Sequence, residues 1–373
     1  MSLAATGPLA GLRVADFSRV LAGPYATMML GDLGAEVIKV ERPPRGDDTR
    51  SWGPPHAADG TSTYFQSVNR NKRTVWLDLD DPDDRAEALA LATSADVLVE
   101  NLAPGTMARF GLGYETLAAT NPGVVYASIS GFGSGSGARM PGYDLLVQAM
   151  GGLMSITGPA PDQPTKVGVA LVDVLTGLHA TVGILAALHE RARSGVGQQV
   201  SVNLLSSTLS ALVNQAQAVV GAGAVPRAMG NAHPSIAPYE TLPTADGVLV
   251  LAVGNDSQFR SLCEVLGLDL ADDPGYATTP ARVANRPALA AALTQVLAAR
   301  PTADWVTDLT AAGVPAGPVN DIPAALELAS RLGLAPVVPV AGVPTVANPI
   351  TLSRTPVDYR LAPPGPHPGP GRG

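Results

Sequence analysis

The stretch that decides the fold reads Leu12-Arg-Val-Ala-Asp-Phe-Ser-Arg-Val-Leu-Ala-Gly-Pro-Tyr-Ala-Thr-Met-Met-Leu-Gly-Asp-Leu-Gly-Ala-Glu-Val-Ile-Lys-Val40. Residues 12–17 predict a strand. Residues 24–33 predict a helix, because Pro24 stands at its first turn and Gly34 follows its last residue. Residues 36–40 predict the next strand. A strand, a helix and a strand in this order form a βαβ unit, in which both strands run parallel.

The same alternation continues through the first half of the chain. Further strands are predicted at residues 74–78, 96–100, 124–129 and 195–202, with a helix over 81–95 that Asp81 caps. This order indicates an α/β, Rossmann-like domain whose mostly parallel sheet is covered on both faces. Ligands of such sheets bind beyond the carboxyl ends of the strands. The residues that follow the strands therefore predict a binding rim; they are 18–23, 41–43, 77–78, 101–103 and 130–133.

The second half of the chain has a different pattern. A long apolar helix is predicted over residues 204–220, and the Gly- and Ala-rich residues 221–230 form a loop. Residues 239–242 and 248–253 flank a turn and predict a hairpin, followed by helices over 257–266, 287–299 and 303–312. We expect a large domain over 1–222, a smaller α+β domain over 223–335, and a segment over 336–373 that returns toward the large domain. That segment carries a short strand at 350–354. It ends in a Pro/Gly tail from 362 that has nothing to pack against, and we expect this tail to be extended or mobile.

The composition excludes several classes of protein. The 373 residues are 46% hydrophobic and 15% charged, which is typical of a globular protein large enough for two domains. The net charge of -8 argues against a general affinity for nucleic acids or anionic membranes. A single cysteine, Cys263, excludes a disulfide framework and a multi-cysteine metal site, so we expect a reducing, cytoplasmic compartment. The five histidines are scattered and predict no metal site.

Two loops bear on the choice of ligand, and one apolar segment bears on whether the chain crosses a membrane. Ser18-Arg-Val-Leu-Ala-Gly-Pro24 follows the first strand without a Gly-x-Gly-x-x-Gly pattern, which argues against a dinucleotide cofactor. Gly131-Phe-Gly-Ser-Gly-Ser-Gly137 is either a lid, a phosphate cradle or a plain mobile loop. The most apolar segment, 170–188, contains Asp173 and His179 and predicts a buried helix of a soluble protein rather than a membrane span.

Lys166-Val-Gly-Val-Ala-Leu-Val-Asp-Val-Leu-Thr-Gly177 places one carboxylate, Asp173, at the start of that helix. One interpretation is an N-cap, whose side chain accepts a hydrogen bond from the first turn and which the helix dipole keeps ionised. The other interpretation is a nucleophile, because an ionised, half-buried carboxylate at a helix start is able to attack a carbonyl. The two roles are compatible.

Several stretches, taken together and in order, resemble the class III coenzyme A transferases (CaiB/BaiF type). That superfamily includes formyl-CoA:oxalate CoA-transferase, carnitine CoA-transferase and the 2-methylacyl-CoA racemases. The resemblance runs from about residue 8 to about residue 360. It rests on residues 20–43, 69–75, 99–105, 142–152 and 166–177, and then on 230–234, 243–247, 252–256 and 313–321.

The resemblance implies a Rossmann-like large domain, a small domain and an interlocked homodimer. It also implies that coenzyme A arrives as a thioester substrate, with no tightly bound cofactor. The catalytic carboxylate of the family matches Asp173. The coenzyme A contacts of the family match Leu21, Arg42, Leu77, Asn101, Leu102 and Arg109. Asp80 and Pro141 stand where the formyl transferase has lysines, so this chain departs from the pattern at two phosphate contacts.

Transferases and racemases of this superfamily differ at one position. A racemase needs two bases on opposite faces of an α-carbon, and racemase-like members place a histidine where this chain has Tyr143. A neutral phenol is a hydrogen-bond donor rather than a base at neutral pH, which favours the transferase. The small-domain residues Gly254, Asn255 and His233 match positions near the acyl group, although His233 also suits a plain loop position before Pro234.

The expected reaction is transfer of coenzyme A from an acyl-CoA to a small carboxylic acid. It proceeds through an anhydride and then a thioester on Asp173. Two alternatives remain: a 2-methylacyl-CoA racemase, and a non-catalytic acyl-CoA-binding protein in which Asp173 only caps its helix.

Overall fold

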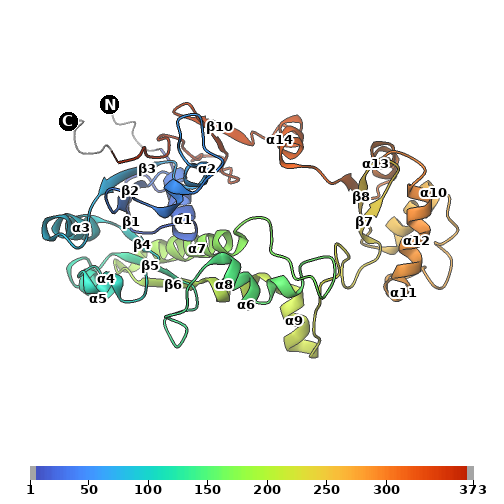
Figure 1. Cartoon of the computed structure of the whole chain (residues 1–373), viewed down its shortest axis with the longest axis horizontal. Helices are drawn as coiled ribbons and strands as arrows, with labels where there is room; N and C mark the ends of the chain where they lie inside the picture. Colours follow the sequence, from blue (N-terminus) through green and yellow to red (C-terminus); the bar gives the residue numbers. More distant parts are fainter. Residues whose placement is uncertain (1–5, 368–373) are drawn as a thin grey trace. The chain divides into compact units, whose positions relative to one another are not determined.

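The computed structural model describes residues 6–367, which divide into two compact units (Figure 1). The first unit comprises the residues up to Leu153, Lys166–Val225 and those from Ala335 onward; the second comprises Met154–Thr165 and Pro226–Leu334. Each unit has its own buried apolar core.

The first unit holds the elements that follow. Its strands are β1 (Arg13–Asp16), β2 (Glu36–Glu41), β3 (Lys72–Trp76), β4 (Val97–Glu100), β5 (Val125–Ser130), β6 (Gln199–Asn203), β10 (Val337–Val340) and β11 (Val343–Val346). Its helices are α1 (Ala22–Asp32), η1 (Asp48–Ser51), α2 (Thr63–Ser67), α3 (Pro82–Ser94), α4 (Thr106–Arg109), α5 (Tyr114–Thr120), α6 (Asp144–Met150), α7 (Leu171–Ser194), α8 (Leu204–Ala211) and α9 (Val213–Ala222). The short η2 (Leu153–Ser155) lies at the boundary between the units.

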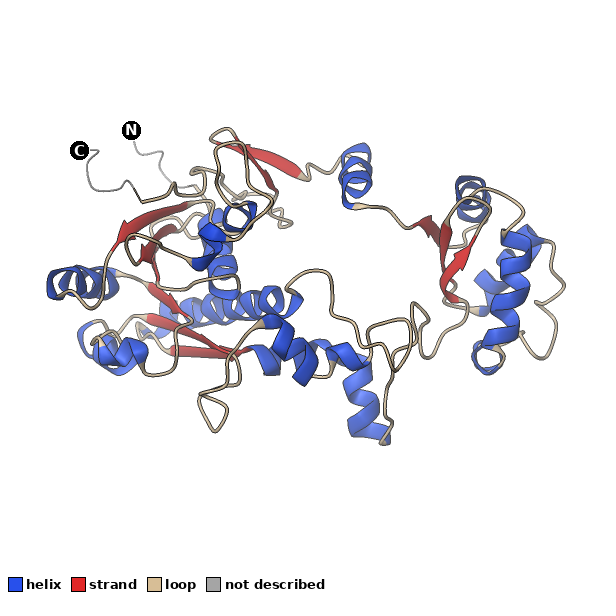
Figure 2. Ribbon diagram, in the orientation of Figure 1, coloured by secondary structure: helices blue, strands red, loops and turns tan. Residues whose placement is uncertain are grey.

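The described residues of this unit form a six-stranded parallel sheet in the order β3-β2-β1-β4-β5-β6. Figure 2 shows its strands between helices, as the alternating sequence pattern predicts. One core cluster joins α1 and α7 to the sheet, and a second joins the sheet to α3 and α5. The order reverses between β1 and β4, and their carboxyl ends therefore mark the point where ligands of such sheets bind.

The predicted membrane-length segment is a core helix. Among the described residues, α7 is the one helix long and apolar enough to cross a membrane. It packs against α1, α8, β5 and β6, and its residues Val172, Ala180 and Ile184 are fully buried in the sheet core. This is the position of the central helix of a soluble α/β protein.

A buried ionic network lies beneath the loop between β1 and α1. Lys39 and Asp47 are both fully buried and 2.9 Å apart, and Lys39 Nζ also donates to the carbonyl of Ser18 at 2.8 Å. Val20 has a φ of 69°, a left-handed conformation that is costly for a β-branched residue. Its backbone N–H donates to Asp47 at 3.2 Å. The ion pair therefore holds this loop in an unfavourable backbone conformation at the reversal point of the sheet.

The second unit is a smaller α+β body. Strands β7 (Tyr239–Pro243), β8 (Val248–Ala252) and β9 (Ala316–Pro318) form an antiparallel sheet, which confirms the predicted hairpin. Its helices are α10 (Asp256–Leu266), α11 (Thr279–Ala284), α12 (Arg286–Leu297), α13 (Thr302–Ala311) and α14 (Ile322–Arg331). The predicted helices correspond to α10, α12 and α13, while α11, α14 and β9 were not predicted.

Three sequence predictions are wrong in detail. The helix predicted over 204–220 is two helices, because Val213 adopts a φ of 40° and ends the first one. Residues 350–354 form no strand; the strands near the end are the β10–β11 hairpin. The tail is not without packing partners, since Arg50 donates to the Pro364 carbonyl at 3.2 Å and Trp76 contacts the His367 ring at 4.8 Å. Tail residues 368–373 lie outside the described residues.

Candidate active site

A groove of about 690 Å³ lies at the carboxyl ends of β1, β4 and β5. Three loops and the start of α7 line it, and the predicted catalytic residues Asp173 and Tyr143 both belong to the lining. Most other lining residues come from the ends of these strands and the loops after them; they are 19–22, 101–104, 129–131 and 138–142. Asp48 of η1 and Leu204 of α8 complete the lining.

Asp173 is not the N-cap of its helix. The cap residue of α7 is Ala170, which offers no side-chain hydrogen bond, and Asp173 is the third residue of the helix. The cap comes from α6 instead: Asp144 Oδ1 accepts from the backbone N–H of Val172 at 2.8 Å and of Asp173 at 3.4 Å. Because another carboxylate satisfies these N–H groups, the Asp173 side chain has no capping role and is left for other chemistry.

A second hydrogen-bond layer fixes Asp144. The side-chain amide of Gln148, which is fully buried, donates to Asp144 Oδ2 at 2.6 Å. The side-chain oxygen of Gln148, Oε1, accepts from the backbone N–H of Val167 at 2.9 Å. Helix α6 therefore holds both the start of α7 and the segment that precedes it, and Asp144 is a positioning residue for Asp173.

The electrostatics of Asp173 differ from the sequence expectation. Burial, with a further contribution from the charge of Asp144, raises the pKa of Asp173 from 3.8 to about 7. The helix dipole was expected to keep this carboxylate ionised, but desolvation and a like charge outweigh it. A carboxylate with a raised pKa is a stronger nucleophile than an ordinary one once it is deprotonated.

Two phenols belong to the surroundings of Asp173. Tyr143 precedes α6, and its exposed side chain lines the groove. Tyr64 on α2 is half-buried; burial and then the charge of Asp173 raise its pKa to about 12, so this phenol stays neutral. Tyr64 was not predicted from the sequence, because it follows no strand and lies in the long connection before β3. Neutral phenols donate hydrogen bonds to developing oxyanions.

The residues predicted to bind coenzyme A lie around this groove and a neighbouring one. Arg42, Leu77, Leu102 and Arg109 line the second groove, of about 250 Å³, while Leu21, Asn101 and Leu102 line the first. Leu102 borders both grooves, which therefore adjoin.

Asn101 joins the two loops that form the reversal point. Its side-chain oxygen accepts from the N–H of Arg19 at 2.8 Å, and its amide donates to the carbonyl of Arg19 at 2.7 Å. In the second groove, the Arg42 guanidinium lies 3.1 Å from Asp78 and 3.2 Å from Asp80. Asp80, which stands at a lysine position of the formyl transferase, thus pairs with the arginine expected to bind phosphate.

The three residues predicted near the acyl group belong to the second unit. Asn255 caps α10 by accepting from Gln258 N–H at 2.9 Å, and Gly254 N–H donates to the Gln258 side chain at 2.8 Å. His233 Nδ1 accepts from Ser235 N–H at 3.1 Å, and its ring packs against Tyr239. Each therefore has a structural task within its unit, and its part in the site stays a prediction.

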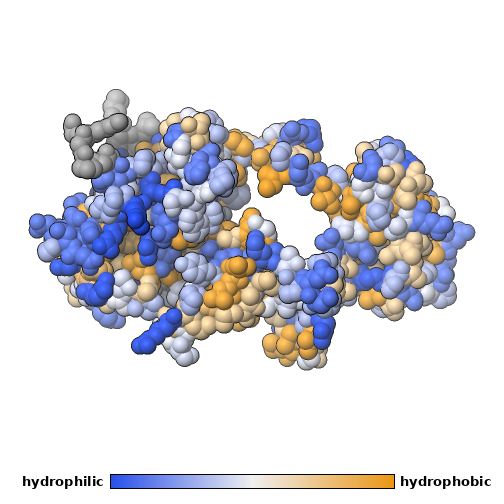
Figure 3. Space-filling model, viewed as in Figure 1, coloured by the Kyte–Doolittle hydropathy of each residue, from blue (hydrophilic) through white to orange (hydrophobic). Residues whose placement is uncertain are grey.

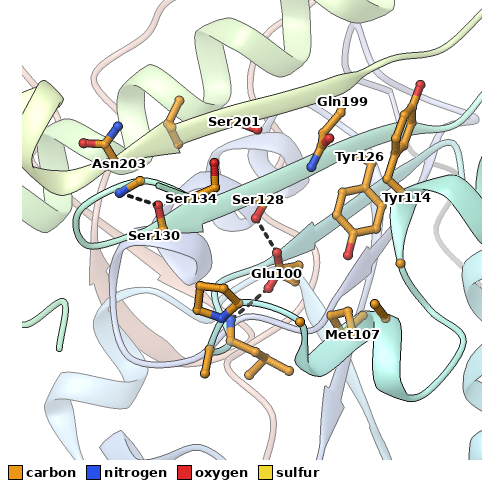
Figure 4. A pocket seen from close by; sticks show the side chains of 18 residues that line it. Glu100, Met107, Tyr114, Tyr126, Ser128, Ser130, Ser134, Gln199, Ser201 and Asn203 are labelled. Carbon is orange, nitrogen blue, oxygen red and sulfur yellow. Dashed lines mark hydrogen bonds between the residues drawn. The ribbon is translucent and has the colours of Figure 1, made fainter. Parts of the chain in front are cut away.

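A third cavity, of about 450 Å³, lies between β4, β5, β6 and α4 (Figure 4). Glu100 at its base accepts from the Ser128 hydroxyl and from the Leu102 N–H. Hydroxyl and amide side chains from β5 and β6 line one side, and mostly apolar residues between β4 and α5, such as Leu102 and Met107, line the other. None of the described lining residues is a lysine, arginine or histidine. A cavity without cations does not suit the phosphates of coenzyme A. Within residues 6–367, no group of three metal-ligating side chains occurs.

Known proteins resemble this chain over nearly its whole length. Residues 9–369 match the family model described as CoA-transferase family III. The chain is 44% identical to a succinate–glutarate CoA-transferase of Agrobacterium fabrum, over 94% of this chain and 91% of that protein. It is 42% identical to an acetyl-CoA:oxalate CoA-transferase of Acetobacter aceti, over 93% and 90% of the two chains.

Solved structures show the same fold. A CaiB/BaiF family protein from Brucella suis superimposes with a TM-score of 0.88 at 41% identity, covering 97% of both chains. A protein from Mycobacterium tuberculosis superimposes with a TM-score of 0.87 at 31% identity, covering 97% of this chain and 98% of that one. The chain therefore belongs to CoA-transferase family III, whose members transfer coenzyme A from an acyl-CoA to a carboxylic acid.

Proposed function

We propose that Asp173 is the nucleophile of a CoA-transferase that acts on the CoA thioesters of small dicarboxylic acids and on the free acids. The observation that carries this proposal is the Asp173 carboxyl group, whose pKa is raised to about 7 in a groove at the reversal point of the sheet. Relatives named for succinate, glutarate, oxalate and mesaconate support the choice of acids.

At each step of the reaction an anion, either a carboxylate or the coenzyme A thiolate, attacks a carbonyl group, and another anion leaves it. The Asp173 carboxylate attacks the thioester carbonyl of the donor, and the C–S bond breaks to give an aspartyl–acyl anhydride and the coenzyme A thiolate. The thiolate then attacks the aspartyl carbonyl, which releases the donor acid and leaves a thioester on Asp173. The acceptor carboxylate attacks this thioester to give a new anhydride, and the thiolate then takes the new acyl group. Asp173 is regenerated without net proton or electron transfer.

The remaining residues take supporting roles in the proposal. Tyr143 donates a hydrogen bond to the oxyanions that form on the attacked carbonyls. Arg42 and Arg109 contact the phosphates of coenzyme A, since a planar guanidinium matches phosphate oxygens. Leu21, Leu77, Asn101 and Leu102 hold the nucleotide and the pantetheine arm, and Gly254, Asn255 and His233 act near the acyl group. Cytoplasmic location fits the single cysteine, Cys263, which is buried.

We also propose that the chain forms an interlocked homodimer. Helices α6, α7, α8 and α9 contact one another in series and expose large apolar side chains (Figure 3). These residues are Leu145, Met150, Leu178, Val182, Leu209, Val213, Val219 and Val220. Large exposed apolar side chains gathered on neighbouring helices are typical of a protein–protein contact.

The direct test is isotope exchange between a labelled free acid and its acyl-CoA. Asp173→Ala should lower the exchange rate by more than about 10³-fold, because the covalent route is lost. Asp48→Ala removes another carboxylate from the same groove and should change the rate by less than about tenfold. Near-normal exchange by Asp173→Ala would refute the proposal. Uptake of solvent deuterium at the α-carbon without CoA exchange would instead support the racemase.

A further inference from the structure

The glycine-rich loop between β5 and α6 is closed at its stem by two glycines. A Cβ atom on Gly131 would lie 2.4 Å from Gly142 Cα, and one on Gly142 would lie 2.6 Å from Gly131 Cα. Such distances exclude any side chain at either position. The two ends of the loop therefore touch, and the residues between them are held at the rim of the Asp173 groove.

This loop carries Arg139 into the lining of the groove. Among the described residues, two cationic side chains line it, Arg19 and Arg139. Arg19 lies 3.9 Å from Asp48, and its backbone is tied to Asn101. Within residues 6–367, Arg139 has no ion pair and no side-chain hydrogen bond. Arg139 is therefore the guanidinium of this groove that is left for a ligand.

The charges around Arg139 indicate what that ligand is. The acidic side chains of the groove are Asp48 and Asp173, with Asp144 directly behind Asp173. A second carboxylate on a substrate would meet repulsion from these acids unless a cation offsets it. The planar fork of a guanidinium binds a carboxylate through two parallel hydrogen bonds.

We propose that Arg139 forms an anion site for the far carboxylate of a dicarboxylic acid, and thereby makes the enzyme prefer dicarboxylic over monocarboxylic acids. This inference rests on the proposed function of Asp173. The competing ligand is a phosphate of coenzyme A. The dicarboxylate is favoured because Arg42 and Arg109 line the adjoining groove, while Arg139 shares its groove with the nucleophile.

The test compares Arg139→Ala, Arg139→Lys and the wild type with succinate, glutarate and butyrate as acceptors and acetyl-CoA as donor. Arg139→Ala should lower kcat/KM for both dicarboxylates by about ten- to a hundredfold. The value for butyrate and the KM for acetyl-CoA should change less than about twofold, because neither ligand uses the site. Arg139→Lys should restore part of the loss. Arg193→Ala, an exposed arginine at the end of α7, is the matched control.

Three outcomes would overturn the inference. An equal loss with succinate and butyrate would mean that Arg139 has no part in acid selection. A raised KM for acetyl-CoA with every acceptor would assign Arg139 to a coenzyme A phosphate. Unchanged kinetics would show that the Arg139 side chain binds neither the far carboxylate of the acid nor a phosphate of coenzyme A. Asp173→Ala, assayed in parallel, separates this inference from the proposed function, since its loss of all exchange supports the nucleophile whatever Arg139 does.

Discussion

At the scale of single residues, Asp144 affects both the position and the protonation of Asp173. From the sequence, Asp173 could be both the cap of its helix and a nucleophile, but the structure shows that the cap is Asp144, a carboxylate 29 residues earlier in the chain. The same contact does two things: it satisfies N–H groups of the first turn of α7, and it places a negative charge that raises the pKa of Asp173. Asp144 thereby couples the position of Asp173, the proposed nucleophile, to its protonation.

This coupling predicts a pH dependence. The reaction needs the Asp173 carboxylate, so kcat/KM should rise with pH and reach half its maximum near pH 7. Asp144→Asn keeps an oxygen that accepts from Val172 but removes the charge, so the midpoint should move to lower pH. It should stay above 3.8, because burial is the larger cause of the shift. A profile measured over pH 4–9 that loses amplitude without moving its midpoint would restrict Asp144 to a structural role.

At the scale of elements, the loop between β1 and α1 depends on the buried pair Lys39–Asp47. Lys39→Met should lower the free energy of unfolding by about 3–5 kcal/mol, because Asp47 then remains buried without its partner. It should also raise the KM for the acyl-CoA, since Asp47 holds Val20 at the groove. Urea unfolding and steady-state kinetics measure the two effects.

A solvent-exposed ion pair on the same sheet provides the control for Lys39→Met. Arg13 and Glu36 lie 3.1 Å apart with side chains that are 43% and 42% exposed. Arg13→Met should cost less than about 1 kcal/mol, because water screens the pair. Equal losses in the two variants would contradict a special role for the buried pair.

The elements that were predicted from the sequence share one property. The units β1-α1-β2 and α3-β4 carry clear periodicity and local stop signals, such as Gly34 and the Asp81 cap. Strand β3 begins two residues before the prediction, because the Lys72 side chain is fully buried 3.1 Å from Asp16, whereas lysine side chains are usually exposed. Helix α11 is only six residues long, too short for a clear apolar period. Helix α14 does carry local signals, namely the Asp321 cap, a proline in its first turn and an amphipathic pattern, and the prediction overlooked them. Local signals therefore sufficed for most long elements, whereas distant partners decide where β3 begins.

At the scale of the whole molecule, the carboxyl ends of the parallel strands gather residues that are far apart in sequence. Leu21, Asn101, Tyr143 and Asp173 line one groove, as the strand order predicts. Tyr64 and the Asp144 cap were beyond prediction, because neither lies in a pattern with a chemical meaning of its own. The sequence therefore predicted the location of the site, whereas the hydrogen bonds that tune it required the structure.

The central claim is that Asp173 carries the acyl group and then coenzyme A. Incubation with an acyl-CoA and hydroxylamine, followed by proteolysis and mass spectrometry of the peptide containing Asp173, tests it most directly. We expect a hydroxamate on Asp173 that forms only when the acyl-CoA is present. An unmodified Asp173 during continued turnover, or a hydroxamate on another carboxylate, would contradict it.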